Sequence, residues 1–130
     1  MAKKASRKKS TAQAFVLPAL KKGEIYKGIV VDQAGKPQYH VAELTIPTTS
    51  KNYADAMAFA KKQGYQLPDR REGALLRASD PFGLSGWFWL REPYEPSDAY
   101  AWCQDFSDGD QGCHHKDDDY RVRLVRQIKI

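Results

Sequence analysis

The stretch from Ser50 to Glu72, SKNYADAMAFAKKQGYQLPDRRE, decides the fold class because it replaces strand-like alternation with helical spacing. Its apolar stripe consists of Tyr53, Ala56, Met57 and Ala60. This spacing predicts a helix over residues 50–63, whose start Ser50 or Asn52 can cap. Gly64 then provides the left-handed stop with which many helices end.

A second helix is expected to begin at the end of the same stretch. Asp69 precedes Glu72 by three residues, which is the spacing of a capping box. Leu75 and Leu76 would supply the buried contacts of this helix, which should end by Asp80–Pro81.

The sequence on both sides predicts strands. Upstream, residues 24–32 (EIYKGIVVD) and 39–46 (YHVAELTI) are separated by a turn, which predicts an antiparallel hairpin. Downstream, strands are expected at 87–90, 100–106, 111–115 and 120–130, with a loop at 92–97 and an Asp-Gly turn at 107–110. Because this order contains no βαβ unit, the chain is expected to be α+β.

The size and composition fit one domain with a tail. The chain has 130 residues, of which 42% are hydrophobic, so most of it should fold. It contains no apolar run of about 18 residues, so no membrane span is expected. Residues 11–20 are too polar, and too interrupted by Pro18, to serve as the apolar part of a secretory signal.

The positive charge is concentrated at the start of the chain. Residues 1–27 carry eight basic side chains and one acidic side chain, a net +7 within a total of +5. Residues 1–22 are therefore predicted to form a basic arm, with residues 23–130 as the domain. The arm could bind nucleic acid or an acidic partner, or it could be a solubilising tail. The basic residues concerned are Lys3, Lys4, Arg7, Lys8, Lys9, Lys21 and Lys22.

Three stretches follow one another in a recognisable order. They are residues 54–72 with their QLPDRRE ending, Gly86–Trp89, and Tyr100–Gly109 followed by Arg121–Arg126. In this order and spacing the sequence resembles the Legionella collagen-like protein C-terminal domain family, similar short forms of which are encoded by phages and prophages. The resemblance covers residues 24–128 and has no counterpart for the basic arm.

This resemblance implies a C-type-lectin-like fold. Two helices should pack on a mixed, mostly antiparallel sheet with the N- and C-terminal strands adjacent. It also implies that loops and strands of the C-terminal half contact the ligand, and it places the protein in a host cytoplasm or a virion.

The most unusual segment is residues 105–119, DFSDGDQGCHHKDDD, with six aspartates. It is read as a solvated acidic loop, as a recognition surface, or as a calcium site, although its spacing matches neither an EF-hand nor a zinc motif. No cofactor is expected, with calcium as the alternative. The residues expected to contact a ligand or partner are Trp87, Trp89, Glu92, Tyr94, Asp108, Asp110, His114, His115, Asp117, Asp118 and Asp119.

Three further groups have competing interpretations. Cys103 and Cys113 flank the Asp-Gly turn almost symmetrically, so a Cys103–Cys113 disulfide would be geometrically feasible, although without an export signal free thiols are favoured. The tryptophans could stack on sugars or form the core. A row of arginines, Arg121, Arg123 and Arg126, could hold a phosphate or pair with acids on neighbouring strands.

No nucleophile-and-base pair, phosphate loop or complete metal motif is recognisable, so an enzyme is not expected. The sequence favours a non-catalytic binding module of phage or prophage origin whose partner is a protein, either in the virion or as a host target. The alternatives are an accessory nucleic-acid binder acting through the arm and a surface glycan-binding protein. Each of these three functions is compatible with an oligomer.

Overall fold

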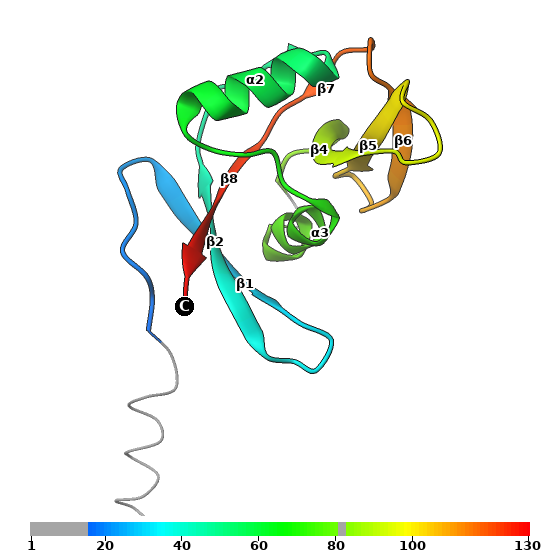
Figure 1. Ribbon diagram of the computed structural model, residues 1–130. Helices are drawn as coiled ribbons and strands as arrows, with labels where there is room; N and C mark the ends of the chain where they lie inside the picture. Colours follow the sequence, from blue (N-terminus) through cyan, green and yellow to red (C-terminus); the bar gives the residue numbers. More distant parts are fainter. Residues whose placement is uncertain (1–15, 81–82) are drawn as a thin grey trace, which may run out of the picture.

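Two sheets and two helices form the part of the chain that the computed structural model describes, residues 16–80 and 83–130 (Figure 1). Of the basic arm, Lys3, Lys4, Arg7, Lys8 and Lys9 lie outside these residues. The elements are β1 (Glu24–Val31), β2 (Pro37–Leu44), β3 (Ser50–Lys51), α2 (Tyr53–Gln63), α3 (Arg70–Ser79), β4 (Trp87–Pro93), β5 (Tyr100–Asp105), β6 (Gln111–His115), β7 (Tyr120–Arg121) and β8 (Leu124–Lys129). The α+β class is therefore confirmed.

The strands form two sheets instead of the one that was expected. The first is antiparallel, in the order β1-β2-β8, so the first and last strands of the described chain meet in one sheet with β2 between them. The second has the order β3-β7-β4-β5-β6 and is mixed, because β4 and β7 are parallel.

The last predicted strand, residues 120–130, is wrong as a single element. It is divided into β7 and β8, which belong to different sheets. Val122 and Arg123 lie between them and are both buried. This two-residue connection is where the chain passes from the second sheet to the first.

Both helices have the predicted caps. Helix α2 begins after Asn52, whose Oδ1 accepts from the Asp55 N–H at 2.9 Å, and it ends at Gly64 with φ of 81°. It starts later than expected because residues 50–51 form β3. Asp69 and Glu72 form the predicted capping box of α3.

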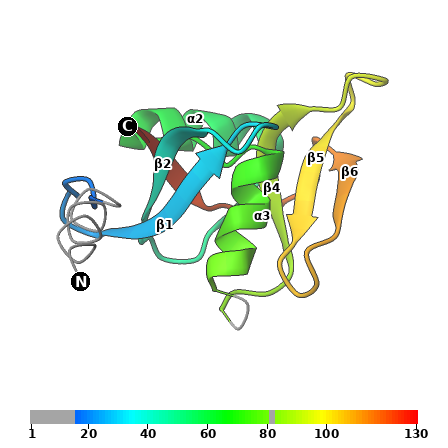
Figure 2. The same ribbon diagram turned by 90° about the horizontal axis from the view of Figure 1, so that it is seen from below.

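Helix α3 packs between the two sheets (Figure 2). On this side Leu76 joins Val41 of the first sheet to Phe88 of the second. Gly73 makes the close approach possible, because a Cβ there would lie 2.8 Å from Gln104 Oε1 and 2.9 Å from Leu90 Cδ2.

Helix α2 covers the opposite face of the second sheet and forms a separate core. Ala56 and Ala60 of α2 pack there with Trp89, Cys103 and other buried residues. No helix among the described residues is long and apolar enough to cross a membrane.

The predicted loop at residues 92–97 starts too early. Strand β4 continues through Glu92 and Pro93, and its pairing with β5 shifts register between Trp89 and Pro93. Such an irregularity accommodates a proline, which has no N–H to donate to the ladder. The hairpins β1–β2 and β5–β6 are confirmed.

Candidate binding surface

The acidic segment at residues 105–119 is not one loop. Strand β6 divides it, so Asp108 and Asp110 precede the strand whereas Asp117–Asp119 follow it. All five of these aspartates are exposed. No group of three His, Cys, Asp or Glu side chains that could hold a metal ion occurs in the described part of the chain.

The two tryptophans of β4 have different surroundings. Trp89 is fully buried, and its Nε1 donates to the Lys51 carbonyl at 2.8 Å. The prediction that Trp89 contacts a ligand is therefore corrected, because the core of α2 surrounds it. Trp87 is half-buried and lies 4.3 Å, between ring centroids, from His114.

His114 and His115 point to opposite sides of the sheet. His114 packs on the side of the α2 core, where burial lowers its pKa, and its Nδ1 lies 3.0 Å from Tyr120 Oη. His115 is exposed and pairs with Tyr100 across the hairpin. The two histidines therefore do not form one site.

On the other face of the β5–β6 hairpin, Trp102, Tyr100 and His115 form a continuous set of rings with Tyr94, which directly follows β4. We call these four residues the aromatic row. The ring centroids of Tyr94 and Trp102 are 5.7 Å apart, and those of Tyr94 and Tyr100 are 6.5 Å apart. Those of Tyr100 and His115 are 5.5 Å apart. The structure thus brings the predicted Tyr94 and His115 together through Trp102, which was considered only as a sugar-stacking or core residue, and Tyr100, which was not a candidate.

Arg70, at the start of α3, completes the aromatic row. Its guanidinium lies 3.7 Å above the Trp102 ring and its Nε donates to Gln111 Oε1 at 2.9 Å. The main-chain N–H of Arg70 donates to Glu92 Oε1 at 2.6 Å. Arg70 and Trp102 are far apart in the sequence, so no spacing indicated that they form one surface.

A chain of hydrogen bonds between polar side chains and the main chain supports Arg70. Gln111 Nε2 donates to the Arg70 carbonyl at 2.8 Å and to Gln104 Oε1 at 2.7 Å. The buried Gln104 donates in turn to the Gly73 carbonyl at 2.7 Å. These bonds tie Arg70 and Gln111 to the buried Gln104, so Arg70 is held on α3 beside Trp102.

A hollow of about 450 Å³ lies beside the aromatic row. It is bounded by Arg70, Trp102, Tyr94 and the loop that carries Glu92, Pro93, Glu95 and Pro96. The predicted residues Glu92 and Tyr94 therefore belong to this surface. What the arrangement offers chemically is apolar contact, ring stacking and hydrogen bonding.

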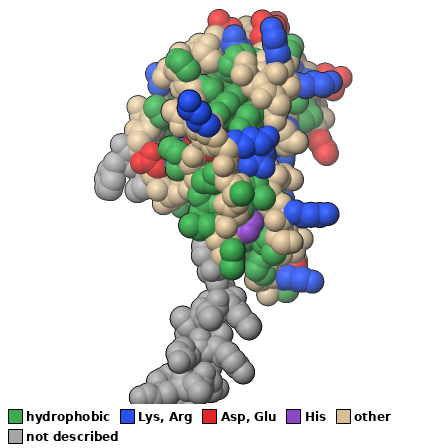
Figure 3. Space-filling model, turned by 90° about the vertical axis from the view of Figure 1, so that its left-hand side faces the viewer, with side chains coloured by type: hydrophobic (Ala, Val, Ile, Leu, Met, Phe, Trp, Pro, Cys, Tyr) green, Lys and Arg blue, Asp and Glu red, His purple; other side chains and the backbone are tan. Residues whose placement is uncertain are grey.

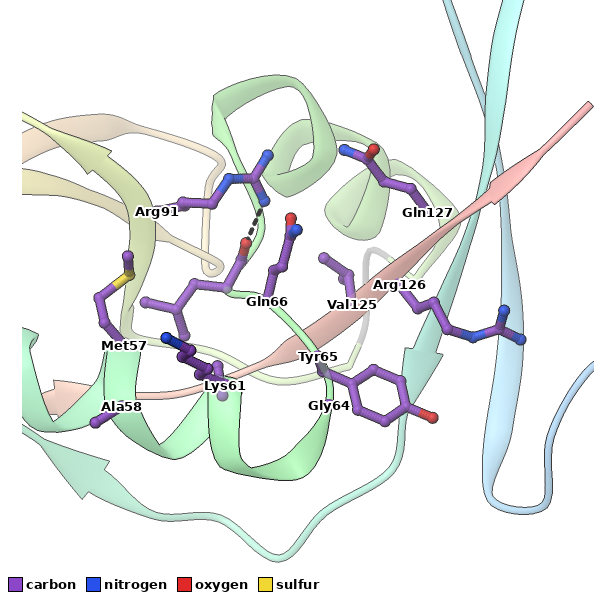
Figure 4. A pocket seen from close by; sticks show the side chains of 12 residues that line it. Met57, Ala58, Lys61, Gly64, Tyr65, Gln66, Arg91, Val125, Arg126 and Gln127 are labelled. Atoms are coloured by element: carbon purple, nitrogen blue, oxygen red, sulfur yellow. Dashed lines mark hydrogen bonds between the residues drawn. The ribbon is translucent and has the colours of Figure 1, made fainter.

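A second pocket, of about 770 Å³, lies between the end of α2, Arg91 and β8 (Figure 4). Its arginines already have partners. Arg91 donates to the Leu67 carbonyl at 2.6 Å and to the buried Glu72, while Arg126 pairs with Glu24. The neighbouring side of the molecule shows hydrophobic and basic side chains intermingled (Figure 3). We therefore regard this pocket as a weaker candidate for a binding site.

Of the two interpretations of the arginine row, pairing with acids is confirmed for Arg123 and Arg126. Arg123 donates to both oxygens of Glu43, at 2.6 and 2.7 Å, and Arg126 to both oxygens of Glu24, at 2.8 Å each. Arg121 lies in the other sheet and donates to the Ser85 carbonyl. The three arginines do not form a row.

The cysteines do not face each other across the hairpin. The register pairs Cys113 with Trp102 and Cys103 with Gly112, so the two thiols lie on opposite faces of the sheet. Cys103 is buried, and burial raises its pKa. Both are free thiols in the structure.

No family model matches the chain, and no curated protein matches it. The resemblance drawn from the sequence motifs therefore stays a prediction.

Proposed function

We propose that this chain is a non-catalytic binding module that recognises a protein through the aromatic row and Arg70. The observation that carries the proposal is the stack of Arg70 on Trp102, with Tyr94 and Tyr100 beside it. Tryptophan, tyrosine and arginine are the residue types that dominate the energetics of protein interfaces.

Preorganisation supports this proposal. The Gln111–Gln104–Gly73 chain holds Arg70 in place, and two prolines stiffen the adjoining loop. Side chains that are already ordered lose little entropy when a partner binds, which favours affinity. The hollow beside Trp102 is the kind of place into which a partner side chain could insert.

The same geometry argues against a sugar ligand. Sugars bind tryptophan by stacking on an open ring face. The Arg70 guanidinium occupies one face of Trp102 at 3.7 Å, which leaves that face unavailable. A polar rim around an apolar centre, here Glu92 and Glu95 around the rings, is instead typical of protein interfaces.

In keeping with the resemblance to phage-encoded proteins, we propose that the partner is a bacterial host protein or a virion component. The test is affinity capture by the tagged full-length chain from nuclease-treated bacterial lysate, with quantitative mass spectrometry. We expect Trp102→Ala and Arg70→Ala to reduce capture of the specific partner about tenfold or more, as hot-spot substitutions do.

The matched control is Val31→Ala, which shortens an exposed side chain on β1 in the other sheet. Circular dichroism of all variants checks that the fold is kept. Capture that is unchanged in Trp102→Ala and Arg70→Ala would contradict the proposal. A parallel capture from untreated lysate is the second control, and a partner that is captured only there would favour the nucleic-acid alternative.

A further inference from the structure

Strand β6 is an open edge of the five-stranded sheet. Two hydrogen bonds frame its pairing with β5: the Asp105 N–H donates to the Asp110 carbonyl, and the Lys116 N–H donates to the Ala99 carbonyl, both at 2.8 Å. Antiparallel pairs alternate between bonded and non-bonded residues. Gly112 and His114 therefore bond to β5.

The alternate residues of β6 point their main-chain groups away from the sheet. These are Gln111, Cys113 and His115, of which only the His115 carbonyl has another main-chain partner, the Asp118 N–H at 3.0 Å, among the described residues. The N–H and C=O groups of Gln111 and Cys113 and the N–H of His115 are thus available to an added strand. This is the surface used when an extended peptide adds to a sheet.

The other sheet edges are protected, and β6 is not. Strand β1 has a bulge between Tyr26 and Gly28, and β3 has only two residues. Strand β8 exchanges two hydrogen bonds with Gln66, at 2.8 and 3.0 Å. Strand β6, in contrast, keeps a regular register with β5 and contains neither proline nor lysine, the residues that usually block edges.

Charge at both ends of β6 determines what can pair with it. Asp108 and Asp110 are exposed at one end, and Asp117–Asp119 at the other. Lys116 is drawn away, with its Nζ 5.5 Å from the centre of the Tyr53 ring. Antiparallel pairing of β6 with a second copy of itself would place these carboxylates against each other, which disfavours self-association.

We infer that β6 accepts an extended segment of the partner protein that carries lysine or arginine at both ends of a short strand. Basic residues at both ends meet the two acidic turns, while the centre bonds to Gln111 and Cys113. Side chains on one face of the added strand extend the aromatic row, because Cys113 lies opposite Trp102 and His115 opposite Tyr100. The inference rests on the proposed function and specifies its partner.

The test uses the full-length chain and a labelled synthetic peptide, KKVTVTVKK, in fluorescence anisotropy. We expect binding that weakens about tenfold when NaCl rises from about 50 to about 500 mM, because the end contacts are exposed ion pairs. The peptide KKVPVPVKK has the same charge but lacks two N–H donors, and the peptide EEVTVTVEE reverses the charge. Both should bind at least about tenfold more weakly.

Two protein variants test the two halves of the inference. Cys113→Pro removes an N–H that points away from β5, so β5–β6 pairing is kept while strand addition is blocked. Cys113→Val is its matched control, and circular dichroism checks folding. The combined change Asp117→Asn, Asp118→Asn and Asp119→Asn removes the charge at one end. Peptide binding should be about tenfold weaker in Cys113→Pro than in Cys113→Val, and about tenfold weaker in the triple variant than in wild type.

Equal binding of KKVTVTVKK and KKVPVPVKK would overturn the inference, because charge alone would then explain it. Self-association of the chain that disappears when Lys3, Lys4, Lys8 and Lys9 are changed to Gln would also overturn it, in favour of the chain's own arm as the occupant. Partner capture that depends on Trp102 but not on Cys113→Pro would reject strand addition and leave the proposed function intact. Partner capture that is unchanged in both Trp102→Ala and Cys113→Pro would reject both strand addition and the proposed function.

Discussion

Glu24 shows how single side chains join segments that are distant in sequence. Its carboxylate accepts two hydrogen bonds from Arg126 at 2.8 Å, one from Tyr65 Oη at 2.6 Å and one from the Lys21 N–H at 2.7 Å. These bonds connect β1 with β8 across β2 and with the segment after α2. The bonds from Arg126 lower the pKa of Glu24 to about 2, against the opposing effect of burial.

This lowered pKa predicts a specific acid sensitivity. A carboxyl whose pKa is lower in the folded state stabilises the protein above its unfolded pKa, and the stabilisation is lost as the pH falls toward the folded value. Glu24→Gln should therefore reduce the free energy of unfolding by about 1–3 kcal/mol at neutral pH and by much less near pH 2. Urea unfolding between about pH 2 and 7 measures this difference.

The control for Glu24→Gln is Glu95→Gln, which removes an exposed carboxylate in the loop after β4. It should leave the unfolding free energy within about 0.5 kcal/mol of wild type. If Glu24→Gln kept the full pH dependence of wild type, the Arg126 pair would not stabilise the fold.

At the scale of elements, the β5–β6 hairpin determines which side chains reach solvent. Its Asp-Gly turn was predictable, because Gly109 adopts φ of 89°, which glycine tolerates without strain. Its register sends alternate residues to the α2 core and to the aromatic row. If the register of β5 shifted by one residue, Trp102 would point into the α2 core and Cys103 would take its place on the opposite face.

Thiol labelling tests this register directly. In the native protein, Cys113 should react with iodoacetamide, whereas Cys103 should react only after unfolding, because it is fully buried and burial raises its pKa. Peptide mass spectrometry of native and urea-unfolded samples measures both sites. Cys103→Ser, with Cys113 retained, is the control for site assignment. Equal native reactivity of the two thiols, or a disulfide between them, would contradict the register.

At the scale of the whole molecule, charge is separated along the chain. The net charge is +5, although residues 1–27 alone carry +7. The exposed aspartates at the two ends of β6 carry a concentration of negative charge. If the arm binds polyanions, as the nucleic-acid alternative proposes, the binding should depend strongly on salt and not on the sequence of the polyanion.

Neutralising the arm tests its contribution. Changing Lys3, Lys4, Lys8 and Lys9 to Gln lowers the net charge from +5 to +1. Any affinity of the chain for duplex DNA should then fall by about tenfold or more at low salt, and the slope of log affinity against log salt should decrease. Electrophoretic mobility shift across a salt series measures both. The control is the same number of changes at Lys36, Lys61, Lys62 and Lys129 in the domain.

The two outcomes have different meanings. If affinity for duplex DNA falls equally in the arm variant and the domain variant, net charge alone controls binding. No binding by wild type at low salt would remove the nucleic-acid alternative and leave the aromatic row as the main surface.

The sequence by itself determined the local structure of this protein. Helical spacing, the Asp69–Glu72 capping box, Gly64 and the Asp-Gly turn depend on contacts between residues a few positions apart, so they are legible in the chain. The α+β class followed from their order. The basic arm is equally local, because charge density needs no fold.

Only the tertiary structure decided which side chains form a surface. Arg70 reaches Trp102 because α3 packs on the second sheet. The hydrogen bond from Gln104 to the Gly73 carbonyl ties α3 to β5. The burial of Trp89 and the division of residues 120–130 between two sheets likewise depend on long-range packing. Such contacts join residues with no fixed sequence separation, so their energies are set by the assembled core and leave no periodic signal in the chain.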